Sequence, residues 1–345
     1  VRLSAAQVGK DTDPYQLCNW LNYKQNGNTG DLTSPDTSIR ANATLKPEIS
    51  TSYEGGLELK FLQNRLGIDF TYYNSRTKNQ VLIVPMTGSF NGKYINAGLV
   101  SNKGVELMLY GTPVKTKDFS FDLTINMAHN LSEVVELTPE KKEVIFNEGE
   151  SNFIIDVGAR EGGKLGDIYP IQSYKRDNNG NIIIRDGYPL IEESKGNDRK
   201  AIGNIQPKLL MSVTPSFAYK GIYLTALLDM KFGGDIVSMS ESVATNYGMA
   251  KRTENRGTIT VKGVNEDGTP NTTAVDAESY YKRIANVAEE FLYDASFIKL
   301  KELSLGYSFP KTLLKKTPFN NLKVAFVARN LCYLMSHTPG TSPEG

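Results

Sequence analysis

The chain has 345 residues, and its 39 lysines and arginines almost balance its 38 aspartates and glutamates, for a formal net charge of +1. This balance gives no reason to expect nucleic acid or another polyanion as a partner. No apolar run approaches the roughly 18 residues of a membrane-spanning helix. The absence of such a run does not exclude a membrane barrel, which crosses the bilayer with strands.

Alternating apolar and polar residues predict strands along much of the chain. Residues 119–127 are the clearest case, with Phe, Phe, Leu, Ile and Met on one face and Ser, Asp, Thr and Asn on the other. We expect about nine strands of roughly 8 to 13 residues, close to the length of a tilted strand that crosses a bilayer. In chain order they are 1–8, 57–61, 66–73, 105–109, 119–127, 209–219, 222–228, 297–309 and 322–334.

The connections between these strands are short and long in turn. The short ones are 62–65, 111–117, 220–221 and 310–321, the last with a helical turn expected at 312–316. The long ones, rich in Gly, Asn, Asp, Ser and Thr, are 9–44, 85–98, 131–206 and 233–295. Tight turns at one rim and long loops at the other are typical of outer-membrane barrels. The sequence therefore predicts an all-β fold that is part of a transmembrane antiparallel β-barrel, with short periplasmic turns and long extracellular loops.

Two local features interrupt this pattern. Pro215 cannot donate to a strand ladder, so it predicts a bulge or a local break within 209–219. Within the long connection 131–206, residues 174–176, a turn at 177–180 and residues 182–184 predict a small hairpin.

Aromatic residues gather beside the short connections, as an aromatic girdle at one membrane interface would require. They are Phe61, Tyr110, Phe119, Phe217, Tyr219, Tyr223, Tyr307, Phe309 and Phe319. A soluble sandwich or jelly roll also produces alternation, because one face packs on a core. In such folds, however, nothing requires the connections that follow successive strands to be short and long in turn.

A further set of short segments runs from the first residues to the last. They are 2–15, 45–48, 53–58, 96–98, 102–106, 231–235, 295–301, 305–307, 329–331 and 342–344. Taken together, these segments resemble the later part of the barrel in a known family, the SusC/RagA-type TonB-dependent transporters of the Bacteroidetes outer membrane.

This resemblance implies a 22-stranded barrel, of which residues 1–345 would be the thirteenth to twenty-first strands. The signal peptide, plug, earlier strands and final strand are expected outside this chain, and an isolated open sheet is not expected to be stable in a membrane. The family implies import of oligosaccharides or, as second choice, peptides, with a SusD-like lipoprotein and the TonB-ExbB-ExbD system as partners. No enzyme activity or cofactor is expected. The alternative from another class is a secreted β-rich adhesin or carbohydrate-binding module.

Aromatic residues in the long loops are the candidates for ligand binding, because sugars and peptides both stack on rings. They are Trp20, Tyr23, Tyr169, Tyr174, Tyr247, Tyr280 and Tyr281. Loop-internal packing is the competing interpretation for each of them.

Other residue patterns point to ordinary structure. Residues 177–181 resemble the start of a calcium loop, but Ile182 and Tyr188 replace its Gly and Glu, so a β-turn is expected. The pairs Glu289–Glu290 and Asp229–Asp235 are interpreted as solvated carboxylates rather than a glycosidase pair. His129 and His337, which are far apart in sequence and each beside an expected strand end, are interpreted as surface polar residues rather than metal ligands or general bases. Cys18 and Cys332 are expected to be isolated thiols, with a bridge between them left open.

Overall fold

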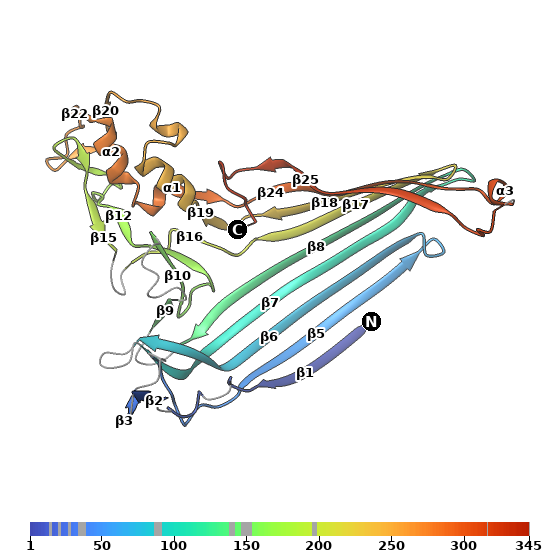
Figure 1. The fold of residues 1–345 in the computed structure, drawn as a ribbon, viewed down its shortest axis with the longest axis horizontal. Coiled ribbons are helices and arrows are strands. Elements are labelled where there is room, and N and C mark those ends of the chain that lie inside the picture. Colours follow the sequence, from blue (N-terminus) through green and yellow to red (C-terminus); the bar gives the residue numbers. More distant parts are fainter. Residues whose placement is uncertain are drawn as a thin grey trace.

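The fold was analysed in a computed structural model, which describes residues 1–13, 16–19, 22–26, 29–33, 39–85, 92–137, 142–145, 154–194, 199–315 and 317–344. One large antiparallel sheet dominates it (Figure 1). Its nine main strands lie side by side in chain order, as the sequence predicts: β1 (Arg2–Lys10), β5 (Glu48–Phe61), β6 (Leu66–Pro85), β7 (Gly92–Lys115), β8 (Phe119–Glu136), β17 (Leu209–Tyr219), β18 (Ile222–Phe232), β24 (Phe297–Ser308) and β25 (Lys323–Ser336). A two-residue strand, β4 (Ile39–Arg40), pairs in parallel with β7.

The short connections lie at one end of this sheet and the long ones at the other (Figure 1). The tight turn between β17 and β18 uses Lys220 and Gly221, whose φ angles of 47° and 93° are typical of a two-residue hairpin turn. The connection between β24 and β25 contains a single helical turn, α3 (Lys311–Leu314), close to its predicted place. Loop length therefore follows strand parity, as expected.

Four strands, β5 to β8, are much longer than the sequence predicted. β6 has 20 residues, β7 has 24 and β8 has 18, so parts of the expected loops 85–98 and 131–206 continue the sheet. Segments such as 74–78 and 101–103 are polar on both faces. The apolar and polar alternation disappears there, so the sequence pattern did not reveal these strand extensions.

The ladder is interrupted where Pro215 was expected to disturb it. Pairing of β17 with β8 continues through Thr214 and Pro215, whereas pairing with β18 lapses at these two residues without a change of register. A β-bulge lies in the next ladder, between Leu227 and Leu228 of β18 opposite β24. The predicted local break is thus confirmed, and the register shift lies one strand away.

The described residues of 142–206 and 233–295 fold into a lobe at the long-loop end of the sheet (Figure 1). The lobe contains α1 (Met239–Asn246), α2 (Ala277–Ile284) and the 3-10 turns η1 (Lys251–Thr253) and η2 (Ala288–Phe291). Its short strands are β9 (Glu143–Ile145), β10 (Ile155–Arg160), β11 (Asp167–Pro170), β12 (Gln172–Tyr174), β13 (Ile183–Arg185), β14 (Tyr188–Pro189), β15 (Ile191–Glu193), β16 (Gly203–Asn204), β19 (Asp235–Val237), β20 (Thr258–Thr260), β21 (Val264–Asn265), β22 (Ala274–Asp276) and β23 (Leu292–Asp294). A separate hairpin at the same end joins β2 (Asn22–Asn26) to β3 (Thr29–Thr33).

The lobe has apolar clusters of its own. One joins Phe291 and Ala288 to Ile154, and another joins Val287 and Ile284 to Tyr174. Both connect the two long loops through residues that are more than a hundred positions apart in sequence. Among the described residues, no helix is both long and apolar enough to cross a membrane.

Candidate functional site

The main sheet has one apolar face. Strand register aligns its side chains in rows that cross the strands, one of which runs Leu59, Ile68, Leu109, Ile125, Val213 and Leu228. Many large apolar residues of this face are exposed, including Leu59, Phe70, Leu224 and Leu305. A soluble sheet would bury such a surface against a second layer. This apolar face therefore requires an apolar medium or another layer of protein.

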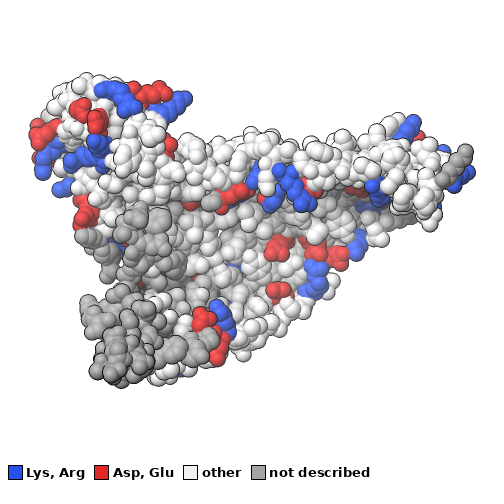
Figure 2. All heavy atoms as spheres, viewed as in Figure 1, with Lys and Arg blue, Asp and Glu red and all other residues white. Residues whose placement is uncertain are grey.

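The opposite, polar face lies in a hollow. Its corresponding row runs Glu58, Asp69, Met108, Asn126, Ser212 and Asp229. Figure 2 shows acidic and basic side chains in the hollow that the curved sheet encloses. Alternation across each strand thus separates the charged face from the apolar face.

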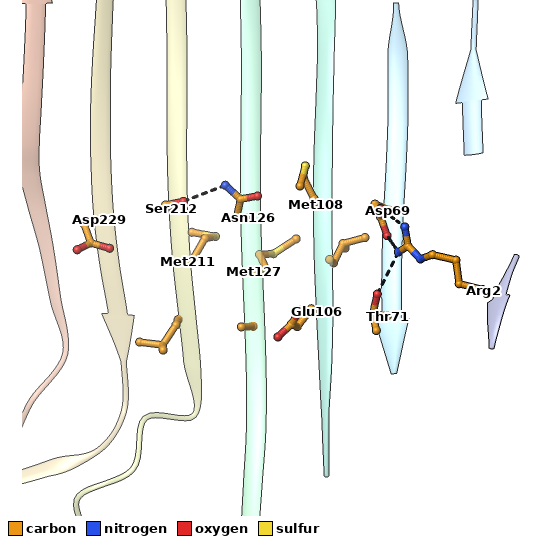
Figure 3. Close-up of a pocket in the computed structure, with 13 residues that line it drawn as sticks. Arg2, Asp69, Thr71, Glu106, Met108, Asn126, Met127, Met211, Ser212 and Asp229 are labelled. Atoms are coloured by element: carbon orange, nitrogen blue, oxygen red, sulfur yellow. Dashed lines mark hydrogen bonds and ion pairs between the residues drawn. The ribbon is translucent and has the colours of Figure 1, made fainter. Parts of the chain in front are cut away.

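A pocket of about 610 Å³ lies on the polar face. It is lined by two neighbouring rows, of which the first contributes Asp69, Met108, Asn126, Ser212 and Asp229. The second row contributes Thr71, Glu106, Ala128 and Leu210, and Arg2 reaches the pocket from β1 (Figure 3). The lining carries three carboxylates and one guanidinium, together with amide and hydroxyl groups.

Arg2 crosses an entire strand to reach this pocket. Its guanidinium donates to both carboxylate oxygens of Asp69 on β6, with Nη1 3.0 Å from Oδ2, passing over Gly56 on the intervening β5 (Figure 3). A Cβ on Gly56 would lie only 3.0 Å from Arg2 Nε. The glycine therefore makes room for the Arg2 side chain.

The bulge between β18 and β24 adds charge to the same face. It leaves Lys301 without a register partner on β18, and Lys301 Nζ lies 2.6 Å from Asp229 Oδ2. The next residue, Glu302, accepts a hydrogen bond from Arg329 Nε at 2.8 Å. Two consecutive charged residues are thus paired across the strands, as a bulge that re-aims side chains permits.

The predicted aromatic girdle is partly confirmed in geometry. Phe61, Phe119, Phe217, Tyr219 and Tyr307 share the apolar face near the short turns. Tyr110 and Tyr223 were assigned to the girdle wrongly, because register places them on the polar face opposite Gly67 and Gly306. A Cβ on either glycine would lie within 2.2 Å of the facing tyrosine Cζ, so each ring lies over a glycine in close cross-strand contact.

Two of the proposed ligand-binding aromatics belong to the interior of the lobe. Tyr169 is 1% exposed, with the guanidinium carbons of Arg160 and Arg199 at 4.6 and 5.2 Å from its ring centre. Burial raises the pKa of Tyr169 to about 12. Tyr174 is also buried, and its hydroxyl donates to Glu290 Oε1 at 2.8 Å. For these two residues the ligand-binding interpretation is not supported, because the long loops fold into a lobe with its own interior.

The structure brings two other candidates together. Tyr247 and Tyr281 both line a cleft of about 420 Å³ at the end of α1 and along α2. Tyr280 is half-buried and contacts Tyr281, with ring centres 5.4 Å apart. Trp20 and the side chain of Tyr23 lie outside the described residues.

The other sequence patterns have structural roles. Asp177 accepts hydrogen bonds from the backbone N–H groups of Asn179 and Asn181 at 2.9 and 2.8 Å, which closes the predicted turn. Glu289 and Glu290 were wrongly interpreted as solvated carboxylates, because they pair with Arg176 and Arg252 at 2.6 and 3.0 Å. The Arg176–Glu289 pair joins the two long loops, whereas the Arg252–Glu290 pair lies within the second.

The remaining titratable candidates are separate from one another. His129 lies within β8, and its Nδ1 contacts the carbonyl oxygen of Lys208 at 2.5 Å. His337 lies 3.7 Å from Asp294. Cys18 and Cys332 are free and exposed. Within the described ranges, no group of three or more His, Cys, Asp or Glu residues could hold a metal ion.

Sequence reasoning missed the polar-face residues. Asp69 and Asn126 were seen only as polar alternates of the strands, Arg2 and Glu106 only as parts of segments that resemble a family, and Asp229 only as a solvated carboxylate. Their alternation does predict a shared face, but their neighbours on that face depend on register. The pairing of seven successive strands, from β1 to β18, brings them to one pocket.

Comparison with known proteins gives a consistent result. A family model described as TonB dependent receptor-like, beta-barrel, matches residues 10–331. TonB-dependent receptor P3 of Formosa agariphila is 25% identical over 323 residues, which cover 88% of this chain and 31% of that protein. TonB-dependent receptor SusC of Bacteroides thetaiotaomicron is 24% identical over 334 residues, with 88% and 30% coverage.

Solved structures agree with this fold. The RagAB peptide importer in its closed-closed state matches 99% of the chain and 38% of its own, with 20% identity and a TM-score of 0.74. The same importer in its open-open state gives a TM-score of 0.68 over 99% of the chain. The chain spans about a third of the length of the curated relatives that it matches.

Proposed function

Because the chain belongs to the TonB-dependent receptor β-barrel family of the outer membrane, we propose that it forms part of the wall of a transporter that imports oligosaccharides. The observation that carries this proposal is the two-faced sheet. Its exposed apolar face suits lipid, and its charged hollow suits a hydrated passage. Transport of this kind needs no covalent chemistry from these residues.

The edges of the sheet support a role within a larger barrel. Every residue of β1 is exposed, and β25 is exposed along most of its length. In hydrocarbon each unpaired backbone group costs several kcal/mol. Both edges therefore require further strands of the same barrel, which agrees with the coverage of about a third of the relatives.

Oligosaccharides are the first choice of cargo for two reasons. The relatives include a SusC protein, and the pocket on the polar face offers amide, hydroxyl and carboxylate groups that can bind sugar hydroxyls. Peptide import is the second candidate. The specific observation in its favour is the match to the RagAB peptide importer along 99% of the chain.

We also propose two partners for the full-length protein. A SusD-like lipoprotein would cover the extracellular end, and the TonB-ExbB-ExbD system would supply energy through the part of the protein that precedes these strands. The similarity to a TonB-dependent SusC supports both. Affinity purification of the tagged full-length protein from outer membranes tests the first, with a co-purifying lipoprotein as the expected result.

A deletion strain tests the proposed cargo. Removal of the full-length gene should abolish growth on one polysaccharide as sole carbon source, while growth on its monosaccharide continues. Complementation by the intact gene should restore growth. Normal growth on every polysaccharide, combined with a growth defect on peptides as sole nitrogen source, would replace oligosaccharides by peptides as the cargo.

A further inference from the structure

We propose that the lobe carries a surface binding site for a neutral oligosaccharide in the cleft of about 420 Å³ between α1 and α2. Residues from three segments line it: Tyr247 follows α1, Arg256 follows η1, and Tyr281 and Lys282 belong to α2. The cleft lies in the lobe, away from the pocket on the polar face of the sheet. This inference rests on the proposed function, because it assumes that the cargo of the transporter is a sugar.

The walls of the cleft are held in place by hydrogen bonds. Ser242 Oγ on α1 donates to the carbonyl oxygen of Ala285, just after α2, at 2.7 Å. Arg256 Nη2 donates to the carbonyl oxygen of Gly248 at 2.6 Å. Asp276 begins α2 by accepting from Ser279 N–H at 2.8 Å. The three segments are therefore held in place before any ligand binds, which lowers the entropic cost of binding.

The aromatic side chain at the rim suits a sugar face. Tyr247 is 72% exposed, so most of its side chain is accessible to a ligand. Tyr281, lower in exposure, lines the same cleft. An exposed ring beside a polar cleft can stack on the apolar face of a pyranose while the polar groups bind its hydroxyls.

The charges of the cleft favour a neutral ligand. The carboxylates of Asp276 and Glu278 are balanced by Arg256 and Lys282, and Glu278 Oε1 already pairs with Lys282 Nζ at 2.7 Å. Asn255 adds an amide to the lining. A balanced set of donors and acceptors binds hydroxyl groups without attracting a net charge of either sign.

The test uses the full-length protein purified in detergent. Isothermal titration calorimetry would measure binding of a panel of neutral hexasaccharides derived from glucans, mannans, galactans and xylans. At least one should bind, and Tyr247→Ala should raise its dissociation constant by about fivefold or more, as expected for loss of one stacked ring. Tyr247→Phe keeps the ring and should bind within about twofold of the unmodified protein.

Met249→Ala is the matched control. Met249 is 82% exposed and lies two residues from Tyr247 but does not line the cleft. This substitution should leave binding unchanged. Equal weakening by Met249→Ala and Tyr247→Ala would indicate a general apolar patch and would overturn the cleft proposal, as would the absence of binding by every hexasaccharide.

Failure of this inference can be distinguished from failure of the proposed function. If Tyr247→Ala leaves hexasaccharide binding unchanged while gene deletion abolishes growth on a polysaccharide, the cleft proposal is wrong and the cargo proposal stands. If a pentapeptide panel binds in a Tyr247-dependent manner and no hexasaccharide binds, the ligand class proposed for the cleft is wrong. Growth of the deletion strain then decides the cargo separately.

Discussion

The substitution Leu107→Arg tests whether the apolar face of the sheet contacts lipid. Leu107 lies on that face of β7, between Phe70 of β6 and Met127 of β8. Its neighbour Met108 lies on the polar face opposite Asp69. An arginine at position 107 would place a guanidinium in hydrocarbon, whereas one at 108 would place it in the charged hollow. The two substitutions form a matched pair.

The expected magnitude follows from the position of Leu107 along β7. Gly111 comes four residues later, beside the 62–65 turn, since Thr112 N–H donates to the carbonyl oxygen of Arg65 at 2.8 Å. At about 3.4 Å per residue and a tilt of about 45°, Leu107 lies about 10 Å from that rim. This is near the middle of an apolar band about 25 Å tall, where an arginine costs about 2–4 kcal/mol.

The assay is denaturant unfolding of the full-length protein folded into phosphatidylcholine vesicles. Leu107→Arg should lower the free energy of unfolding by about 3 kcal/mol, and Met108→Arg by less than about 1 kcal/mol. Heat-modifiable migration on gels confirms that each variant folds. If the two variants lose equal stability, or if Met108→Arg loses more, the assignment of the apolar face to lipid is wrong.

Three further predictions concern single contacts. Gly306→Ala should lower the free energy of unfolding by about 1–3 kcal/mol, because its Cβ would lie 2.2 Å from Tyr223 Cζ. The loss should be smaller when Tyr223 is also replaced by Ala. An equal loss with and without the Tyr223 ring would contradict the contact. Glu143→Gln removes the charge of a buried carboxylate that pairs with two half-buried arginines and should speed proteolysis of the lobe, whereas substitution of the more exposed Glu161 by Gln should have little effect. Raising the pH from 10 to 12 should destabilise the lobe by about 2 kcal/mol, since Tyr169 ionises near pH 10 when unfolded but near 12 when folded. Well below pH 10 Tyr169 is neutral in both the folded and the unfolded state, so it should not make stability depend on pH there. Absorbance at 295 nm follows tyrosine ionisation. If Tyr169 ionises at the same pH as the exposed tyrosines, the prediction is wrong.

Local pattern was sufficient to predict the main strands and their order. The alternation of apolar and polar residues in segments such as 119–127 is a local property, because successive side chains of a strand point to opposite faces of the sheet. Short connections force neighbouring strands to pair as antiparallel hairpins. The strand extensions of β6 to β8 escaped prediction because segments such as 74–78 are polar on both faces, and because Leu82, Val100 and Val134 pack against the lobe, a contact that no local pattern indicates.

The lobe could not be predicted in the same way. Tyr174 and Glu290 are 116 residues apart in sequence but form a hydrogen bond, and Arg176 and Glu289 are 113 apart. Nothing local to either loop indicates its partner. The same reasoning explains why the loop aromatics divided into buried Tyr169 and Tyr174 and exposed Tyr247.

The sequence by itself determined that this protein is a two-faced antiparallel sheet with its long loops at one end, because alternation and connection length are properties of neighbouring residues. Only the tertiary structure decided which polar residues share a pocket and which tyrosines are free to meet a ligand. Strand register lets Arg2 reach Asp69 across Gly56. The packing of α1 against α2 makes Tyr247 and Tyr281 line the same cleft. Both depend on contacts between segments far apart in the chain, which no local pattern specifies.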